Sequence, residues 1–151
     1  MITLLRTDST HHDFIALVRL LDADLAARDG QEHSFYAQFN KIDLIKHAIV
    51  AYDDGKPAGC GAMKEFDLQS VEIKRMYVLP DRRGKGIASE ILSALERWAK
   101  ELSYRACVLE TGKRQPEAVA LYKKNGYTTI PNYGQYAGIE NSLCFKKNLQ
   151  Q

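Results

Sequence analysis

The run Arg82-Arg83-Gly84-Lys85-Gly86-Ile87-Ala88 decides how this chain folds. It follows a strand-like stretch at 71–79 and opens an amphipathic stretch that ends at 102, so it forms a glycine-rich turn between a strand and a helix. Such a turn leaves backbone N–H groups pointing outward at the positive end of the helix dipole, and its glycines let a ligand approach closely. The run predicts a site for a phosphate or diphosphate; the alternative is a helix start preceded by a solvated basic loop.

Strand and helix patterns alternate on both sides of this turn. Strands are expected at 2–6, 48–52, 58–66, 71–79, 106–110, 127–130 and 142–145, and helices at 13–28, 84–102 and 117–125. The stretch 31–46 predicts a second short helix or a structured loop. The strand–helix–strand unit over 71–110 should pair its two strands in parallel through a right-handed crossover. The expected fold class is α/β (α+β), with a mixed central β-sheet of about six to seven strands flanked by about four helices.

Two finer expectations concern which side chains are buried. The helix at 84–102 should bury one apolar side, formed by Ile87, Ile91, Leu92, Leu95, Trp98 and Leu102. Regular alternation along 71–79 should place Ile73, Arg75 and Tyr77 on one face of the sheet. The other face of that strand would then carry Glu72, Lys74, Met76 and Val78.

Composition sets the class of protein. The chain has 151 residues, which is the size of a single domain over 1–151. Its 21 basic and 19 acidic residues give a net charge of +2, which argues against a dedicated nucleic-acid binder. No apolar stretch approaches the roughly 20 residues that span a bilayer, and the first residues lack a signal-peptide pattern. We therefore expect a cytoplasmic protein that contacts neither nucleic acid nor membrane.

The three cysteines, Cys60, Cys107 and Cys144, lie apart in apolar runs, which predicts buried reduced thiols. No cysteine or histidine has the spacing of a metal ligand, so no metal site is expected.

Two blocks of sequence resemble one family in the right order. Val78-Leu79-Pro80-Asp81-Arg82-Arg83-Gly84-Lys85-Gly86-Ile87-Ala88 matches the pattern V-x-P followed by R/Q-x-x-G-x-G/A. Pro116-Glu117-Ala118-Val119-Ala120-Leu121-Tyr122-Lys123-Lys124-Asn125-Gly126-Tyr127 matches A-x-x-L-Y-x-x-x-G-F/Y. With these blocks the chain resembles the GNAT superfamily of acyl-CoA-dependent N-acetyltransferases.

The resemblance implies acetyl-CoA as cosubstrate. Backbone amides of the turn would hold the diphosphate, and the end of the preceding strand would run beside the pantetheine arm. The residues implied to bind the donor are Tyr77, Val78, Arg83, Gly84, Lys85, Gly86, Ile87, Ala88 and Gln115. Gln115 departs from the asparagine that the family often has there.

The resemblance also implies catalytic roles. Tyr122 would be the general acid for the departing thiolate, because a phenol is protonated at neutral pH; the alternative is a core aromatic. Glu72 would accept the proton of the amine; the alternative is a carboxylate paired with Lys74 or Arg75. The backbone N–H of Val78 would stabilise the developing oxyanion.

The expected function is transfer of an acetyl group from acetyl-CoA to a primary amine of a small molecule or peptide, by direct attack in a ternary complex. The alternatives are a non-catalytic acyl-CoA-binding or sensing module and a nucleotide-phosphate binder, although the turn lacks the Gly-x-x-x-x-Gly-Lys-Ser/Thr spacing. The acceptor pocket would draw on the first helical region and the last hairpin, and a packed loop is the alternative for 133–136. Candidate lining residues are Phe35, Tyr36, Asn132, Tyr133 and Tyr136, with Asp22, Asp24 or Glu140 as anionic contacts. A homodimer, the commonest soluble assembly, is compatible with the sequence.

Overall fold

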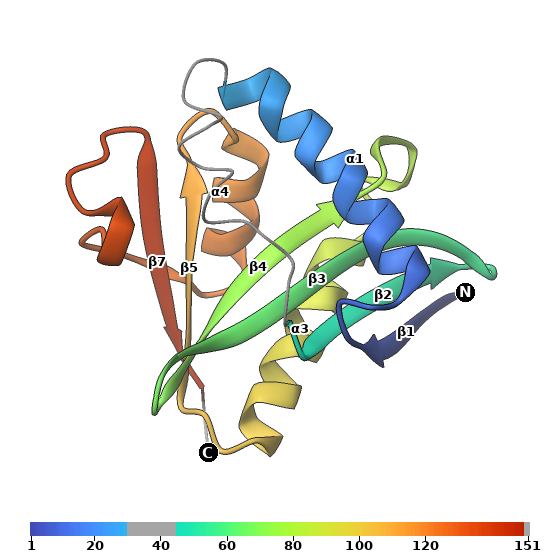
Figure 1. The fold of residues 1–151 in the computed structure, drawn as a ribbon, viewed down its shortest axis with the longest axis horizontal. Coiled ribbons are helices and arrows are strands. Elements are labelled where there is room, and N and C mark those ends of the chain that lie inside the picture. The colour runs from blue at the N-terminus through green and yellow to red at the C-terminus, as the bar shows by residue number, and fades with distance from the viewer. Residues whose placement is uncertain (30–44, 150–151) are drawn as a thin grey trace.

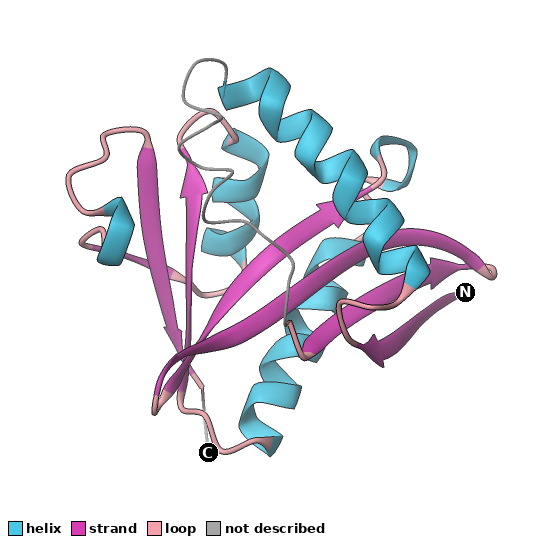
Figure 2. Cartoon of the chain, in the orientation of Figure 1, coloured by secondary structure: helices cyan, strands magenta, loops and turns pink. Residues whose placement is uncertain are grey.

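The computed structural model describes residues 1–29 and 45–149 of the chain, which form one seven-stranded sheet with helices on both faces (Figures 1 and 2). The strand order is β1-β2-β3-β4-β5-β7-β6. Of these neighbouring strands only β4 and β5 run parallel. The strands are β1 (Ile2–Thr7), β2 (His47–Asp53), β3 (Lys56–Asp67), β4 (Ser70–Val78), β5 (Ala106–Gly112), β6 (Thr128–Ile130) and β7 (Ser142–Asn148).

Three α-helices occur within the described residues: α1 (His12–Asp29), α3 (Ile87–Glu101) and α4 (Pro116–Lys124). The mixed sheet and the parallel pairing of β4 with β5 confirm the fold expected from the sequence. The short helix or loop expected at 31–46 falls almost entirely outside the described residues.

The two faces of the sheet carry separate apolar clusters. Helix α1 lies across one face, where Phe14 and Leu17 pack with Val50 and Cys60 (Figure 1). Helices α3 and α4 lie on the other face, and their side chains join a larger cluster with residues of β2 to β5 and β7. Below, these are called the α1 face and the α3 face.

Helix α3 approaches the sheet closely because β3 carries glycines beneath it. A Cβ at Gly61 would lie 2.6 Å from Sδ of Met76 and 2.8 Å from Cγ2 of Ile91. The helix ends at Glu101, so Leu102 follows its last turn and stays 42% exposed. The expectation that Leu102 belongs to the buried side is therefore wrong.

Strand β4 departs from regular alternation at a β-bulge. Ala62 pairs with Lys74 and Cys60 with Tyr77, so two residues, Arg75 and Met76, lie opposite the single residue between them on β3. Arg75 accommodates the extra residue with a left-handed backbone, φ 60°.

The bulge overturns the expected division of side chains along β4. Ile73 packs in the α3-face cluster and Tyr77 in the α1-face cluster, whereas regular alternation would place both on one face. Lys74 lies opposite Ala62, a member of the α1-face cluster, so Lys74 shares that face. One inserted residue thus reverses the face of the sheet to which each later side chain of β4 points.

Strands β4 and β5 separate soon after they begin to pair. Their parallel register covers Ser70 to Glu72 on β4 and Ala106 to Val108 on β5. Beyond these residues β5 continues beside β7 as far as Gly112, while β4 diverges from it (Figure 1). The sheet is therefore open between the second halves of its two central strands.

Candidate active site

The glycine-rich turn presents exposed backbone amides at the start of α3. Gly84 and Gly86 both have φ 82°, and a Cβ at either position would meet no atom within 4 Å. Gly86 caps the helix without a side-chain hydrogen bond from any described residue, and the amide of Glu90 donates to its carbonyl at 3.1 Å. The amides of the first turn point away from the helix, as an anion-binding helix start requires.

The arginines of this turn are engaged within the fold. Nε of Arg82 lies 3.2 Å from Oδ2 of Asp53, and its Nη1 lies 3.0 Å from Asp81. Nε of Arg83 donates to the carbonyl oxygen of Val78 at 2.9 Å. These contacts offset part of the positive charge expected here, and the Arg83 bond fastens the turn to the end of β4.

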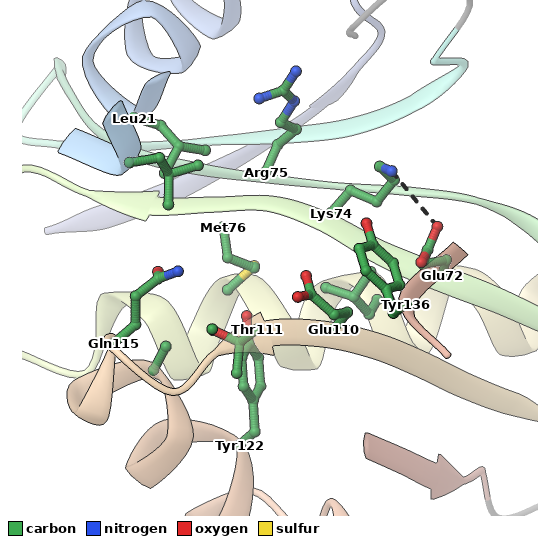
Figure 3. A pocket seen from close by; sticks show the side chains of 14 residues that line it. Leu21, Glu72, Lys74, Arg75, Met76, Glu110, Thr111, Gln115, Tyr122 and Tyr136 are labelled. Carbon is green, nitrogen blue, oxygen red and sulfur yellow. Dashed lines mark ion pairs between the residues drawn. The ribbon is translucent and has the colours of Figure 1, made fainter. Parts of the chain in front are cut away.

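Two cavities lie at the opening between β4 and β5. The larger has a volume of about 400 Å³ and runs from the glycine-rich turn along the end of β4 to α4. The smaller has a volume of about 100 Å³ and lies where the two strands separate (Figure 3). The residues that line both are Leu21, Met76, Gln115, Ala118 and Tyr122.

Most residues expected to contact the donor line the larger cavity. They are Tyr77, Val78, Arg83, Gly84, Gly86, Ile87, Ala88 and Gln115. Lys85 is the exception, because its side chain is exposed and does not line this cavity.

Tyr122 of α4 lies at the junction of the two cavities. Its side chain is 6% exposed, and its ring packs 5.8 Å from that of Tyr127. Burial raises the pKa of Tyr122 above its ordinary value, and the charge of Glu110 raises it further. The residue is therefore both a core aromatic and a protonated hydroxyl at the cavity wall.

Glu72 of β4 lines the smaller cavity and is bonded within the fold. The hydroxyl of Tyr133 donates to Oε2 at 2.7 Å, and Nζ of Lys74 lies 3.6 Å from Oε1. Burial raises the pKa of Tyr133, and the charge of Glu72 adds to the effect. Of the two partners expected for a structural Glu72, the ion pair forms with Lys74, while Arg75 pairs with Asp22.

The backbone amide of Val78 faces the opening. The amide of Leu79 donates to Ala58 of β3 at 2.9 Å. Because neighbouring amides in a strand point to opposite edges, the Val78 N–H points away from β3 toward the side that β5 has left.

The last loop is packed and also borders the smaller cavity. Tyr136 is 2% exposed, forms a small cluster with Cys144 and lines the cavity. Asn132 holds the loop by donating to the carbonyls of Ile139 and Ser142 at 3.1 and 2.9 Å. The packed interpretation is correct, and the loop supplies Tyr136 to the cavity as well.

The other acceptor candidates are scattered. Glu140 is exposed and lines neither cavity, whereas Asp24 lines the larger one. Phe35 and Tyr36 lie outside the described residues. Asp22 pairs with Arg75 at 2.7 Å.

Sequence reasoning did not single out Glu110, which lines the smaller cavity just past the point where β5 leaves β4. A signal existed in the strand pattern. Cys107 and Leu109 pack in the α3-face cluster, so Glu110 points to the opposite face of the sheet and follows four apolar residues of the strand.

Within residues 1–29 and 45–149, no three His, Cys, Asp or Glu side chains gather as a metal site would require. The helices of that same portion are too short or too polar to cross a membrane. All three cysteines are buried thiols, as the sequence predicted.

A turn that presents amides, an opened pair of parallel strands and a tyrosine at their junction are the features that the resemblance implied. The model of the acetyltransferase (GNAT) family matches residues 14–127. The chain belongs to this family. It is therefore an acyltransferase by class, as expected from its two sequence blocks.

Relatives agree with this membership. An IAA acetyltransferase of Azospirillum brasilense is 36% identical over 103 residues, which cover 67% of each protein. The uncharacterized N-acetyltransferase YjgM of Escherichia coli is 43% identical over 88 residues, 54% of this chain and 50% of that protein.

Solved structures of GNAT proteins share the whole fold. A candidate acyl-CoA N-acyltransferase of Klebsiella pneumoniae is 29% identical with a TM-score of 0.83, covering 99% of both chains. The PaiA N-acetyltransferase of Thermoplasma acidophilum, solved with coenzyme A, has a TM-score of 0.73 at 17% identity, covering 98% of this chain and 99% of that one. Structural neighbours of this GNAT chain thus bind coenzyme A.

Proposed function

We propose that this GNAT chain transfers an acetyl group from acetyl-CoA to a primary amine of a small molecule or peptide, by direct attack within a ternary complex. The observation that carries the proposal is that Tyr122 lines both cavities, one of which reaches the glycine-rich turn while the other is lined by Glu72 and Glu110. An elongated acyl thioester would fit this arrangement, with its phosphates held at the glycine-rich turn and its reactive carbonyl near Tyr122.

The donor would be held by backbone groups. The amides that follow Gly84 and Gly86 would bind the diphosphate, and the open space beside both glycines is the cradle that a Cβ would intrude on. The opened edge of β4 at Tyr77 and Val78 would pair with the amide-bearing pantetheine arm. Gln115 would contact the donor from the start of α4.

Proton movements would use groups from opposite faces of the sheet. Tyr122, from the α3 face, would give its proton to the leaving sulfur, and its raised pKa keeps it protonated until then. Glu72, on the α1 face, would take the proton of the amine through water. The N–H of Val78 would donate to the acyl oxygen.

A spectrophotometric assay that follows thiol release from acetyl-CoA across a panel of amines tests this function. Release that depends on both acetyl-CoA and an amine supports it, together with mass-spectrometric detection of the acetylated product. Tight coenzyme A binding in calorimetry without turnover of any amine would instead indicate the acyl-CoA-binding or sensing alternative.

A further inference from the structure

The β-bulge places two consecutive cationic side chains on one side of β4. In a regular strand Lys74 and Arg75 would point to opposite faces. Because of the bulge both line the smaller cavity, and Arg75 points away from Met76 (Figure 3). Their side chains are only 10% and 4% exposed. Two buried cations side by side are costly to desolvate, so their placement calls for anionic partners.

One edge of the Arg75 guanidinium has its partner within the fold. Nη1 donates to Oδ1 of Asp22 at 2.7 Å, which ties the bulge to α1. Nε is buried and has no hydrogen-bond partner among the described residues. A planar guanidinium grips a carboxylate with two parallel N–H bonds, and the edge that includes Nε is suited to such a grip.

The carboxylates of the cavity lie elsewhere on its wall. Glu72 pairs with Lys74, and Glu110 comes from β5 just beyond the last pair of the β4–β5 register. A cavity with a buried arginine at one position and carboxylates at another is complementary to a molecule that carries both charges.

From this arrangement we infer that the acceptor is an amino carboxylate, a small molecule with a primary amine and a carboxylate group. Arg75 binds its carboxylate through the Nε edge, and the carboxylates of the cavity attract its ammonium group. The inference rests on the proposed acetyl transfer and names the acceptor class for that same site. An amine on a peptide side chain, with no carboxylate nearby, would leave the Nε edge unused.

Matched pairs of acceptors isolate the carboxylate. Glycine, β-alanine and 4-aminobutyrate would each be compared with the corresponding amide, which keeps the amine and removes the negative charge. We expect kcat/KM to favour the carboxylate by about tenfold or more in the best pair, as a charge-assisted hydrogen bond would give. The chain length at which the preference peaks reports the separation of the two subsites.

Two variants on the same ion pair separate recognition from folding. Arg75→Gln should reduce the carboxylate-to-amide ratio about tenfold, while Asp22→Asn, which leaves Arg75 in place, should preserve the ratio. Coenzyme A affinity, measured by calorimetry, checks that both variants keep the donor side intact. An unchanged ratio in Arg75→Gln, or an equal fall in both variants, would overturn the inference, and so would a wild-type enzyme that prefers the amides.

Failure of the proposed function has a different signature. If no amine is acetylated, calorimetric titration of β-alanine into the coenzyme A complex still tests Arg75. Binding by the wild type that Arg75→Gln weakens about tenfold would support the carboxylate site even then. Equal binding or no binding by both proteins would refute it.

Discussion

Replacing Gly86 with glutamate tests the donor site at its most exposed point. A Cβ at this position would meet no atom within 4 Å, so the longer side chain fits without a clash. The added carboxylate would stand beside the amides that we propose bind the diphosphate. The chain offers a matched control in Gly55, which has φ 84° and equally open surroundings at the turn between β2 and β3.

The expected magnitude follows from two separate effects. A side chain in the left-handed region costs about 1 kcal/mol, and this cost should be the same at Gly86 and Gly55 because their φ angles are 82° and 84°. A full negative charge about 7 Å from one charge of the diphosphate is unfavourable by about 2 kcal/mol at an effective dielectric constant of about 20. Coenzyme A affinity should therefore fall about 30-fold or more in Gly86→Glu.

The assay is isothermal titration of coenzyme A into Gly86→Glu and Gly55→Glu, with urea unfolding of both variants in parallel. We expect a similar small loss of stability in the two proteins and a loss of affinity in Gly86→Glu alone. Equal affinities in the two variants would show that the diphosphate does not bind at this turn, and the proposed donor site would then be refuted.

Three further substitutions test other parts of the site. Tyr122→Phe should lower kcat about 100-fold and leave the KM for acetyl-CoA nearly unaltered. The control Tyr127→Phe, on the neighbouring ring, should leave kcat intact. If Tyr122→Phe turns over as fast as the wild type, the Tyr122 hydroxyl has no role in the mechanism. Glu72→Gln should lower kcat most at low pH. The loss should shrink as pH rises, because more of the amine is then already neutral. A loss of kcat that is the same at every pH would indicate a structural role for Glu72 beside Lys74. Gly61→Ala should destabilise the fold by about 1–3 kcal/mol in urea unfolding, because its Cβ would collide with α3, and unchanged stability would contradict the close packing.

Local patterns were sufficient for the mixed sheet, its parallel pair of strands and the glycine-rich turn. The glycine-rich turn and the strand–helix–strand unit over 71–110 depend on short stretches of chain, and each corresponds to an observed element. The donor contacts that we propose follow from the sequence, because backbone amides at a helix start point outward whatever the side chains are. Lys85 shows the limit of this reasoning, since its charge lies in the right segment but its side chain is exposed and outside the cavity.

The side-chain arrangement at the proposed acceptor site could not be predicted, because it depends on a single extra residue in β4. Nothing in Ile73-Lys74-Arg75-Met76-Tyr77 marks Arg75 as the residue that takes a left-handed backbone, since that conformation is unfavourable for any side chain of this kind. Tertiary packing selects it: Ile73 and Tyr77 each enter a different apolar cluster, which regular alternation does not permit. The apolar clusters on both faces of the sheet therefore determine together which way each side chain of β4 points.

The bulge and the opening between β4 and β5 together shape the cavities that the proposed reaction would use. A regular β4 would place Arg75 and Tyr77 on the same face as Ile73, and a continuous pair of strands would use the outward N–H of Val78 for the ladder. Instead, the ladder ends at Glu72 and Val108, and the backbone beyond it faces the cavities. Buried backbone groups need hydrogen-bond partners. The N–H and C=O groups of this strand edge can therefore bond to an amide-bearing ligand that enters from the α3 face. In the proposed reaction, the shifted phase would leave Lys74 and Arg75 to receive the second substrate from the α1 face, and the two substrates would meet at Tyr122 from opposite sides of one sheet.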